Sequence, residues 1–287
     1  MARSSQPKPV TLDKKIVYVT GLPRSGSTLL CQLLGMHPKI YSPQHSSPLA
    51  PTLTGIRSNL SSNPFLLSQL DVDFDLVYQR MLNGHRGFLN GWFNEAAEKV
   101  VVDKNRLWLR IIETVAALDP DFQMIVCVRD LRQVFGSVEA QHQRTLLIDF
   151  VDNMPAASPY QRADQLFGDD GVIGAPLKSL QFLQDLPESF RQRVSYVEFD
   201  ALVSNPIGTM NVLYDWLGMK SHMFDPDNLE TRPHESDSHY RYKFRHATRD
   251  HIAAPTVHEL PPRVEQEIMT NFGWYYELFY PDRLPAD

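Results

Sequence analysis

Short apolar runs alternate along the chain with segments whose apolar residues recur at helical spacing. The runs lie at residues 16–19, 100–102, 122–128 and 194–199. They are rich in β-branched residues and therefore predict buried strands. The segments that follow them predict helices at residues 27–36, 107–118, 131–141 and 207–217. Strands that alternate with helices in this way predict an α/β fold, in which a parallel β-sheet is flanked by helices on both faces.

Three segments depart from this alternation. They are residues 41–65, 145–190 and 225–258. The first is rich in Ser and Pro and predicts a long loop, the second predicts a polar insertion with one helix, and the third has weak periodicity but many His, Arg and Tyr residues. A last helix is expected at residues 262–272, before an aromatic tail. Because no repeat divides the chain, we expect one domain at residues 15–287 behind a flexible tail, residues 1–14.

The composition is that of an ordinary globular protein. Among the 287 residues, 43% are apolar and the formal net charge is −6, which excludes wholesale disorder and argues against general nucleic-acid binding. No apolar run is long enough for a membrane span, and residues 1–15 lack the apolar core of a signal peptide. Cys31 and Cys127 lie in apolar segments, so they predict neither a disulfide framework nor a cysteine zinc site. We therefore expect a cytoplasmic protein.

The turn between the first predicted strand and helix has the features of an anion-binding loop. It reads Gly21-Leu22-Pro23-Arg24-Ser25-Gly26-Ser27-Thr28. Glycine lets the backbone approach an oxyanion, and the free N–H groups at a helix start point toward it. The spacing matches the nucleoside-triphosphate P-loop, but Ser27 replaces its lysine and Arg24 is the cation instead. Only Asp103 and Asp130 are candidate magnesium ligands, so the loop indicates an anion other than a magnesium triphosphate; the alternative is a turn without a ligand.

Residues 19–30 resemble the 5′-phosphosulfate loop of sulfotransferases that use 3′-phosphoadenosine 5′-phosphosulfate (PAPS). The following His37-Pro38 is similar to the tyrosylprotein branch of that family and its bacterial relatives. The resemblance implies a P-loop-containing, sulfotransferase-like three-layer fold, with PAPS as cofactor and no metal. The loop residues that it places on the cofactor are Pro23, Arg24, Ser25, Gly26, Ser27 and Thr28.

A second motif follows the third predicted strand. Arg129 opens the next helix, and Ser137 lies eight residues later, about two helical turns on, so both side chains can share one ligand. The resemblance implies that they hold the 3′-phosphate, for which an Arg fork and a hydroxyl are suited. The alternative is a surface pair of Arg129 with Asp130. Where the tyrosylprotein enzymes have another phosphate-binding Arg, this chain has Gln141, and Arg144 is a candidate substitute.

Two further stretches resemble the family. Residues 197–206 are similar to its Tyr-Glu-x-Leu-x-x-Asn-Pro segment, but Phe199 stands where a Tyr is usual, so we interpret this segment as structural. Lys104 resembles a family lysine near the sulfate, and its alternative is a solvated surface lysine. In residues 237–246 cations and aromatics interleave, which suits a lid that places Tyr240 and Arg241 on the nucleotide; the alternative is a solvated basic loop.

The acceptor hydroxyl needs a base. In the tyrosylprotein branch this is a Glu shortly after the His-Pro, and the matching pair here is Gln44-His45. A neutral imidazole is a competent base near neutral pH. The resemblance therefore predicts His45 as the base, with Arg24 and Lys104 as the other catalytic side chains; the alternative is a loop histidine without a role.

These observations predict in-line transfer of a sulfuryl group from PAPS to an acceptor hydroxyl. The acceptor is a small molecule or the tyrosine of a peptide, and we expect residues 46–95 and 145–190 to line its site. A homodimer is compatible with the sequence. The alternatives are a nucleotide-dependent kinase with an atypical P-loop and a non-catalytic protein that binds a nucleotide or sulfate. Asp71, Asp73 and Asp75 predict an acidic loop and a helix N-cap rather than a metal site.

Overall fold

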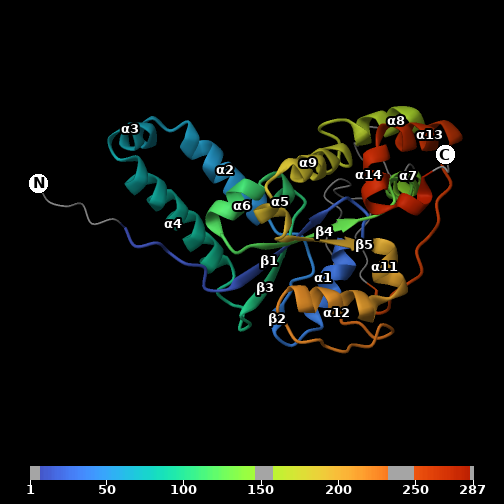
Figure 1. Cartoon of the computed structure of the whole chain (residues 1–287), viewed down its shortest axis with the longest axis horizontal. Coiled ribbons are helices and arrows are strands. Elements are labelled where there is room, and N and C mark those ends of the chain that lie inside the picture. The colour runs from blue at the N-terminus through green and yellow to red at the C-terminus, as the bar shows by residue number, and fades with distance from the viewer. Residues whose placement is uncertain (1–6, 146–157, 232–248, 285–287) are drawn as a thin grey trace, which may run out of the picture.

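A computed structural model describes residues 7–145, 158–231 and 249–284 of the chain (Figure 1). Its centre is a five-stranded sheet with the order β2-β3-β1-β4-β5, in which every pair of neighbours is parallel. The strands are β1 (Lys15–Gly21), β2 (Ile40–Tyr41), β3 (Val100–Lys104), β4 (Gln123–Val128) and β5 (Val194–Glu198). The four predicted strands are confirmed, whereas the two-residue β2 is too short to leave an apolar pattern.

Helices cover both faces of the sheet. On one face, α1 (Ser27–Gly35) and α12 (Pro206–Trp216) pack against Val17 and Val19 of β1. On the other face, Ile16 and Tyr18 join a larger core. This alternation along β1 buries successive side chains on opposite faces, as expected for a strand inside a parallel sheet. The predicted α/β fold with a parallel sheet between two helical layers is confirmed.

The remaining elements are α2 (Leu49–Ser61), α3 (Pro64–Val72), α4 (Phe74–Trp92), α5 (Leu107–Arg110), α6 (Ile112–Leu118), α7 (Leu131–Thr145), α8 (Pro159–Phe167), α9 (Gly174–Asp185), α10 (Glu188–Arg191), α11 (Phe199–Ser204), α13 (Pro262–Asn271), α14 (Gly273–Phe279) and a 3₁₀ turn (Pro281–Arg283). Helices α2, α3 and α4 stand away from the sheet as an arm (Figure 1). Asp73 caps α4 by accepting a hydrogen bond from the Leu76 N–H at 3.1 Å, as the acidic sequence predicted. Among the described residues, no helix combines the length and hydropathy needed to cross a bilayer.

Two predictions of irregular structure are wrong. The predicted loop at residues 41–65 contains α2 and the start of α3, because Leu49, Ala50 and Leu53 fall on one helical face and are completely buried. The Ser and Pro residues around these three positions make the helical spacing of the apolar residues hard to recognise in the sequence. The insertion predicted to hold one helix contains α8, α9 and α10, and the aromatic tail forms α14.

The N-terminal segment runs along α4. Asn83 and Asn90, two helical turns apart, each hold it from both sides: their side-chain oxygens accept the N–H groups of Val10 and Asp13, at 2.8 and 2.9 Å. Their amide groups donate to the carbonyls of residues 8 and 11, at 3.0 and 2.8 Å. Residues 8–13 of the predicted tail therefore have hydrogen-bond partners for their backbone on α4, as the backbone of a strand has in a sheet.

The first loop begins with a close backbone approach. At Gly21 the chain has φ 132°, and the next residue, Leu22, donates its N–H to the Cys127 carbonyl at 3.1 Å. A Cβ atom on Gly21 would overlap that carbonyl oxygen. Cys127 and Cys31 are buried, and neither forms a disulfide bond in the described part of the chain. Glycine at position 21 therefore lets β1 leave the sheet beside β4 and start the anion-binding loop.

We expect Gly21→Ala to destabilise the protein by about 3 kcal/mol or more, because the new Cβ meets backbone and the positive φ is strained. The matched control is Gly87→Ala on α4, where a Cβ meets nothing, and this variant should gain about 0.5–1 kcal/mol of helix stability. Urea unfolding of both variants measures the two signs. Equal effects at the two positions would contradict the close approach at Gly21.

Candidate functional site

Two residues with positive φ shape the loop between β1 and α1. Arg24 has a left-handed φ of 60°, and Gly26 follows with φ 85°. Ser25 turns inward, where its hydroxyl donates to the Leu22 carbonyl at 2.6 Å, and Pro23 is also buried. No side chain in the described part of the chain caps α1. The N–H groups of its first turn, from Ser27 onward, are therefore available to a ligand.

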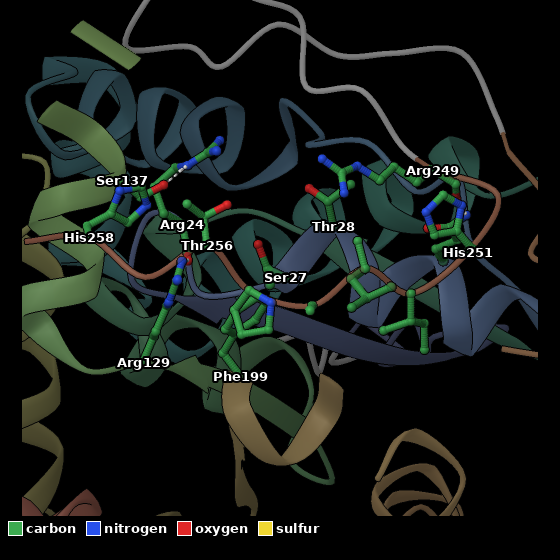
Figure 2. A pocket seen from close by; sticks show the side chains of 17 residues that line it. Arg24, Ser27, Thr28, Arg129, Ser137, Phe199, Arg249, His251, Thr256 and His258 are labelled. Carbon is green, nitrogen blue, oxygen red and sulfur yellow. Dashed lines mark hydrogen bonds between the residues drawn. The ribbon is translucent and has the colours of Figure 1, made fainter. Parts of the chain in front are cut away.

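A cavity of about 290 Å³ lies in front of this helix start (Figure 2). It is lined by Arg24, Gly26, Ser27, Thr28, Leu29, Gln32, Arg129, Ser137, Phe199, Arg249, His251, Ile252, Ala253, Ala254, Pro255, Thr256 and His258. The predicted loop residues and the second motif thus share one cavity. Pro23 and Ser25 do not line it and instead shape the loop.

Two guanidinium groups converge on the cavity. Arg24 donates from Nε to the Ser137 hydroxyl at 3.0 Å, and Arg129 donates to the Arg24 carbonyl at 3.0 Å (Figure 2). The Arg129 guanidinium lies 4.4 Å from the centre of the Phe199 ring. Its Nε is buried and has no hydrogen-bond partner among the described residues, and the residue as a whole is only 6% exposed. A buried donor without a partner is costly, so this arrangement favours an anion between the two arginines.

The surroundings of Arg129 lower its pKa. Burial lowers it, and the nearby Arg24 lowers it further, whereas Asp200 raises it. Two positive charges that line one cavity repel each other, and a bound dianion would offset that repulsion. Arg129 is therefore a cavity residue and not the surface partner of Asp130.

Asp130 has a separate, structural role. It is 1% exposed and is bound by Arg132, Arg283 and Tyr276. Burial raises its pKa, but the hydrogen bonds from these three side chains outweigh that effect and lower the pKa to about 2. Asp130 thus joins the start of α7 to the C-terminal helices behind the cavity.

Lys104 is buried beside the loop rather than solvated. It is 6% exposed and donates from Nζ to the Thr28 hydroxyl at 2.9 Å. The strand register places it opposite Val19, just before the loop begins. The lysine does not line the cavity itself, but it brings a positive charge to the first turn of α1.

His45 lies on the neighbouring segment and is exposed. Ser46 pairs with Lys104 in a parallel bridge, and the Ser47 N–H donates to the Lys104 carbonyl at 3.0 Å. The His45 Nδ1 lies 3.2 Å from the Ser46 carbonyl oxygen, a geometry that suits an Nδ1–H donor and leaves the Nε2 lone pair free to accept a proton. The structure thus places His45 next to Lys104, outside the cavity lining.

Some predicted residues fall outside the described part of the chain. Tyr240 and Arg241 do, and the side chain of Arg144 is not described. Glu230 and Arg249, which come before and after the predicted lid in the sequence, both contact α1. The Gln32 side chain donates to their carbonyls at 2.9 and 2.8 Å. Gln141 is buried on α7 and does not line the cavity.

The sequence reasoning missed two parts of the site. Phe199, interpreted above as part of a structural segment, lines the cavity beside the Arg129 guanidinium, and a Cβ on Gly26 would lie 2.6 Å from its ring. Its position at the end of β5 was the available signal, since ligands of parallel sheets bind at the carboxyl ends of strands. The segment from Arg249 to His258 was missed as well, because its irregular pattern predicts no element.

Asp103 is a buried carboxylate next to the catalytic candidates. Its Oδ1 accepts a hydrogen bond from the Trp108 Nε1 at 2.6 Å. Burial raises its pKa to about 6, although hydrogen bonds from Ser47 and Trp108 and the proximity of His45 oppose the rise. The ionised form is therefore disfavoured in the folded protein, so this group stabilises the fold fully below pH 3.8 and loses that contribution as the pH rises through about 6.

Asp103→Asn should keep the Trp108 hydrogen bond and remove the cost of burying a charge. The shift from 3.8 to about 6 corresponds to roughly 3 kcal/mol, so the variant should gain up to that amount relative to wild type between about pH 4 and about pH 8. Urea unfolding at both pH values measures it, with Asp215→Asn on the exposed side of α12 as control. A gain that is the same at both pH values would contradict the assignment.

Comparison with known proteins shows which family the chain belongs to. A family model described as the sulfotransferase family matches residues 17–225, which is more than half of the chain. No curated protein matches it. Among solved structures, the sulfotransferase domain from the curacin biosynthetic pathway is 19% identical, with a TM-score of 0.55, and the match covers 92% of this chain and 99% of that domain.

Two bacterial enzymes show the same fold. A sulfotransferase from Alicyclobacillus acidocaldarius is 13% identical with a TM-score of 0.51, over 91% of this chain and 92% of that one. Sulfotransferase STF9 from Mycobacterium avium is 14% identical with a TM-score of 0.50, over 93% of this chain and 77% of that one. The family match, together with the two-arginine cavity at the start of α1, shows that the chain belongs to the sulfotransferase family.

Proposed function

We propose that this sulfotransferase transfers the sulfuryl group of PAPS to an acceptor hydroxyl. One observation carries the proposal: Arg24 and Arg129, from two different strand ends, converge with Ser137 on one cavity at the uncapped start of α1. Cations and free N–H groups in one place suit a ligand with several anionic groups.

The residues of the cavity fit such a nucleotide. The N–H groups at the start of α1 hold its 5′-phosphosulfate, and Arg129 with Ser137 holds the 3′-phosphate. The buried Nε of Arg129 then gains the acceptor that it lacks among the described residues. Phe199 offers an aromatic face on the same cavity.

When bound, PAPS supplies an activated sulfuryl group. Arg24 and the first-turn N–H groups stabilise charge on the oxygens of the leaving phosphate, and Lys104 adds positive charge beside Thr28. These groups are fixed before the reaction by Ser137, Thr28 and the loop itself, so little reorganisation is needed. His45 accepts the acceptor's proton at Nε2.

The geometry argues against the kinase alternative. Ser27 stands at the P-loop lysine position. Of the two candidate magnesium ligands, Asp130 is bound by three side chains, and Asp103 is completely buried and accepts a hydrogen bond from Trp108. The non-catalytic alternative differs from our proposal in one respect, since it gives His45 no chemical role.

We expect 3′-phosphoadenosine 5′-phosphate (PAP) to bind more tightly than ATP with magnesium, because the site supplies fixed cations for two separated phosphates. Isothermal titration calorimetry measures both. Arg24→Ala should weaken PAP binding about tenfold or more, whereas the control Arg263→Ala, on the exposed side of α13, should not. Tighter binding of ATP with magnesium than of PAP would overturn the proposal.

His45→Ala should leave PAP affinity intact and reduce turnover by about 10²–10⁴, the usual contribution of a general base. Turnover is measured with labelled PAPS and an acceptor from a screen of phenols, alcohols, sugars and tyrosine peptides. His222→Ala, which changes a histidine packed against His37, is the control. Unchanged turnover in His45→Ala would show that the base lies elsewhere.

A further inference from the structure

The arm formed by α2, α3 and α4 contains a cavity of its own. Its volume is about 470 Å³, and the described residues that line it come from all three helices. The apolar ones are Ile56, Leu60, Leu66, Val77, Met81 and Phe88. None of the lining residues also lines the cavity at the start of α1, and Figure 1 shows that the arm stands away from the sheet. A ligand in the arm would therefore occupy a separate site.

The outer part of the arm does not fill its own interior. The buried residues of α2 are Leu49, Ala50 and Leu53, all at the start of the helix. No residue of α3 is buried, although this helix carries apolar side chains such as Leu66. A helix of a globular protein normally buries its apolar stripe against a neighbour. The apolar side chains around the cavity are thus available to an apolar ligand.

Gly84 keeps the wall of the cavity open on α4. It lines the cavity from inside the helix, where glycine is disfavoured relative to alanine. A Cβ atom at this position would meet nothing within 4 Å, so a larger side chain would stand here without a clash and would narrow the cavity. The glycine therefore lowers helix stability at a point where it leaves space for a ligand.

The charge of the lining is positive. Its charged side chain is Arg80, which has no hydrogen bond or ion pair with any described residue, and the described lining residues include no Asp or Glu. The buried His85 has its Nδ1 2.7 Å from the Met81 carbonyl oxygen, which suits an Nδ1–H donor. An imidazole held in this way offers a lone pair rather than a charge, so the partner for an anionic group is Arg80.

We propose that the arm cavity binds an amphipathic anion, with its alkyl chain among the apolar side chains and its anionic head group on Arg80. The volume lies within the range of about 300–1,000 Å³ that is usual for small-molecule sites. Two turns of a helix about 10–12 Å wide occupy roughly 800 Å³, which exceeds the cavity, whereas a single alkyl chain is much narrower. The inference does not depend on the proposed function, because the acceptor hydroxyl must reach the start of α1.

Isothermal titration calorimetry with decanoate tests the proposal. Decanoate should bind one to one, and octanoate should bind about tenfold more weakly, because two fewer CH₂ groups enter the apolar cavity. Decyltrimethylammonium has an equally long chain but a cationic head group, and it should bind at least about fivefold more weakly than decanoate. Arg80→Gln should weaken decanoate binding about fivefold and should not weaken the binding of decyltrimethylammonium.

Gly84→Leu locates the site. Its side chain narrows the cavity and should weaken decanoate binding about tenfold or more. Gly91→Leu is the matched control, since it lies on the same helix, its Cβ also meets nothing within 4 Å and it does not line the cavity. Trp92 gives a second readout, because it stacks on the lining residue Phe88 with ring centres 6.3 Å apart. Decanoate should change the tryptophan emission of wild type but not that of Trp92→Phe.

Several outcomes would overturn the proposal. These are the absence of decanoate binding, equal affinities for decanoate and decyltrimethylammonium, and binding that is unchanged in Gly84→Leu. Analytical ultracentrifugation tests another occupant: a dimer that Gly84→Leu disrupts and Gly91→Leu does not would show that a second copy fills the cavity instead. Thermal melts show whether each variant is folded, and Arg80→Gln with the Trp92 readout keeps the test valid if Gly84→Leu is not.

Discussion

The candidate site brings two arginines, Arg24 and Arg129, to one cavity despite the repulsion between their positive charges. Arg24 reaches the cavity only because the loop adopts left-handed backbone at positions 24 and 26, and the Ser137 hydroxyl then fixes its Nε. Arg129 is held from the other side by the Arg24 carbonyl and the Phe199 ring. An anion is the natural counterpart of such a pair, and the sheet places it at the carboxyl ends of β1 and β4.

The C-terminal part of the chain supports the second arginine from behind. The Tyr275 hydroxyl accepts the Arg129 N–H at 3.2 Å and donates to its carbonyl at 2.9 Å. Asp130, next in sequence, is bound by Tyr276 and by arginines from α7 and the 3₁₀ turn. A buried, satisfied polar network of this kind fixes one orientation of the backbone, so α14 positions the cavity without lining it.

The sequence was most informative where function and local pattern coincide. The apolar runs and the Gly-rich turn predicted the sheet, the loop and the positions of Arg24, Arg129 and Ser137, because each of these depends on neighbours in sequence. The helix α2 was missed since its three buried residues stand among Ser and Pro. The segment from Arg249 to His258 was missed for another reason: the Gln133 side chain holds the backbone of His258, 125 positions away, and no local sequence pattern indicates such a pairing.

The central claim is that the cavity holds a nucleotide by two phosphates at once. A crystal structure with PAP tests it most directly. The account predicts the 5′-phosphate on the N–H groups at the start of α1 and the 3′-phosphate between Arg129 and Ser137. A nucleotide bound outside this cavity, or one whose 3′-phosphate points away from Arg129, would contradict it.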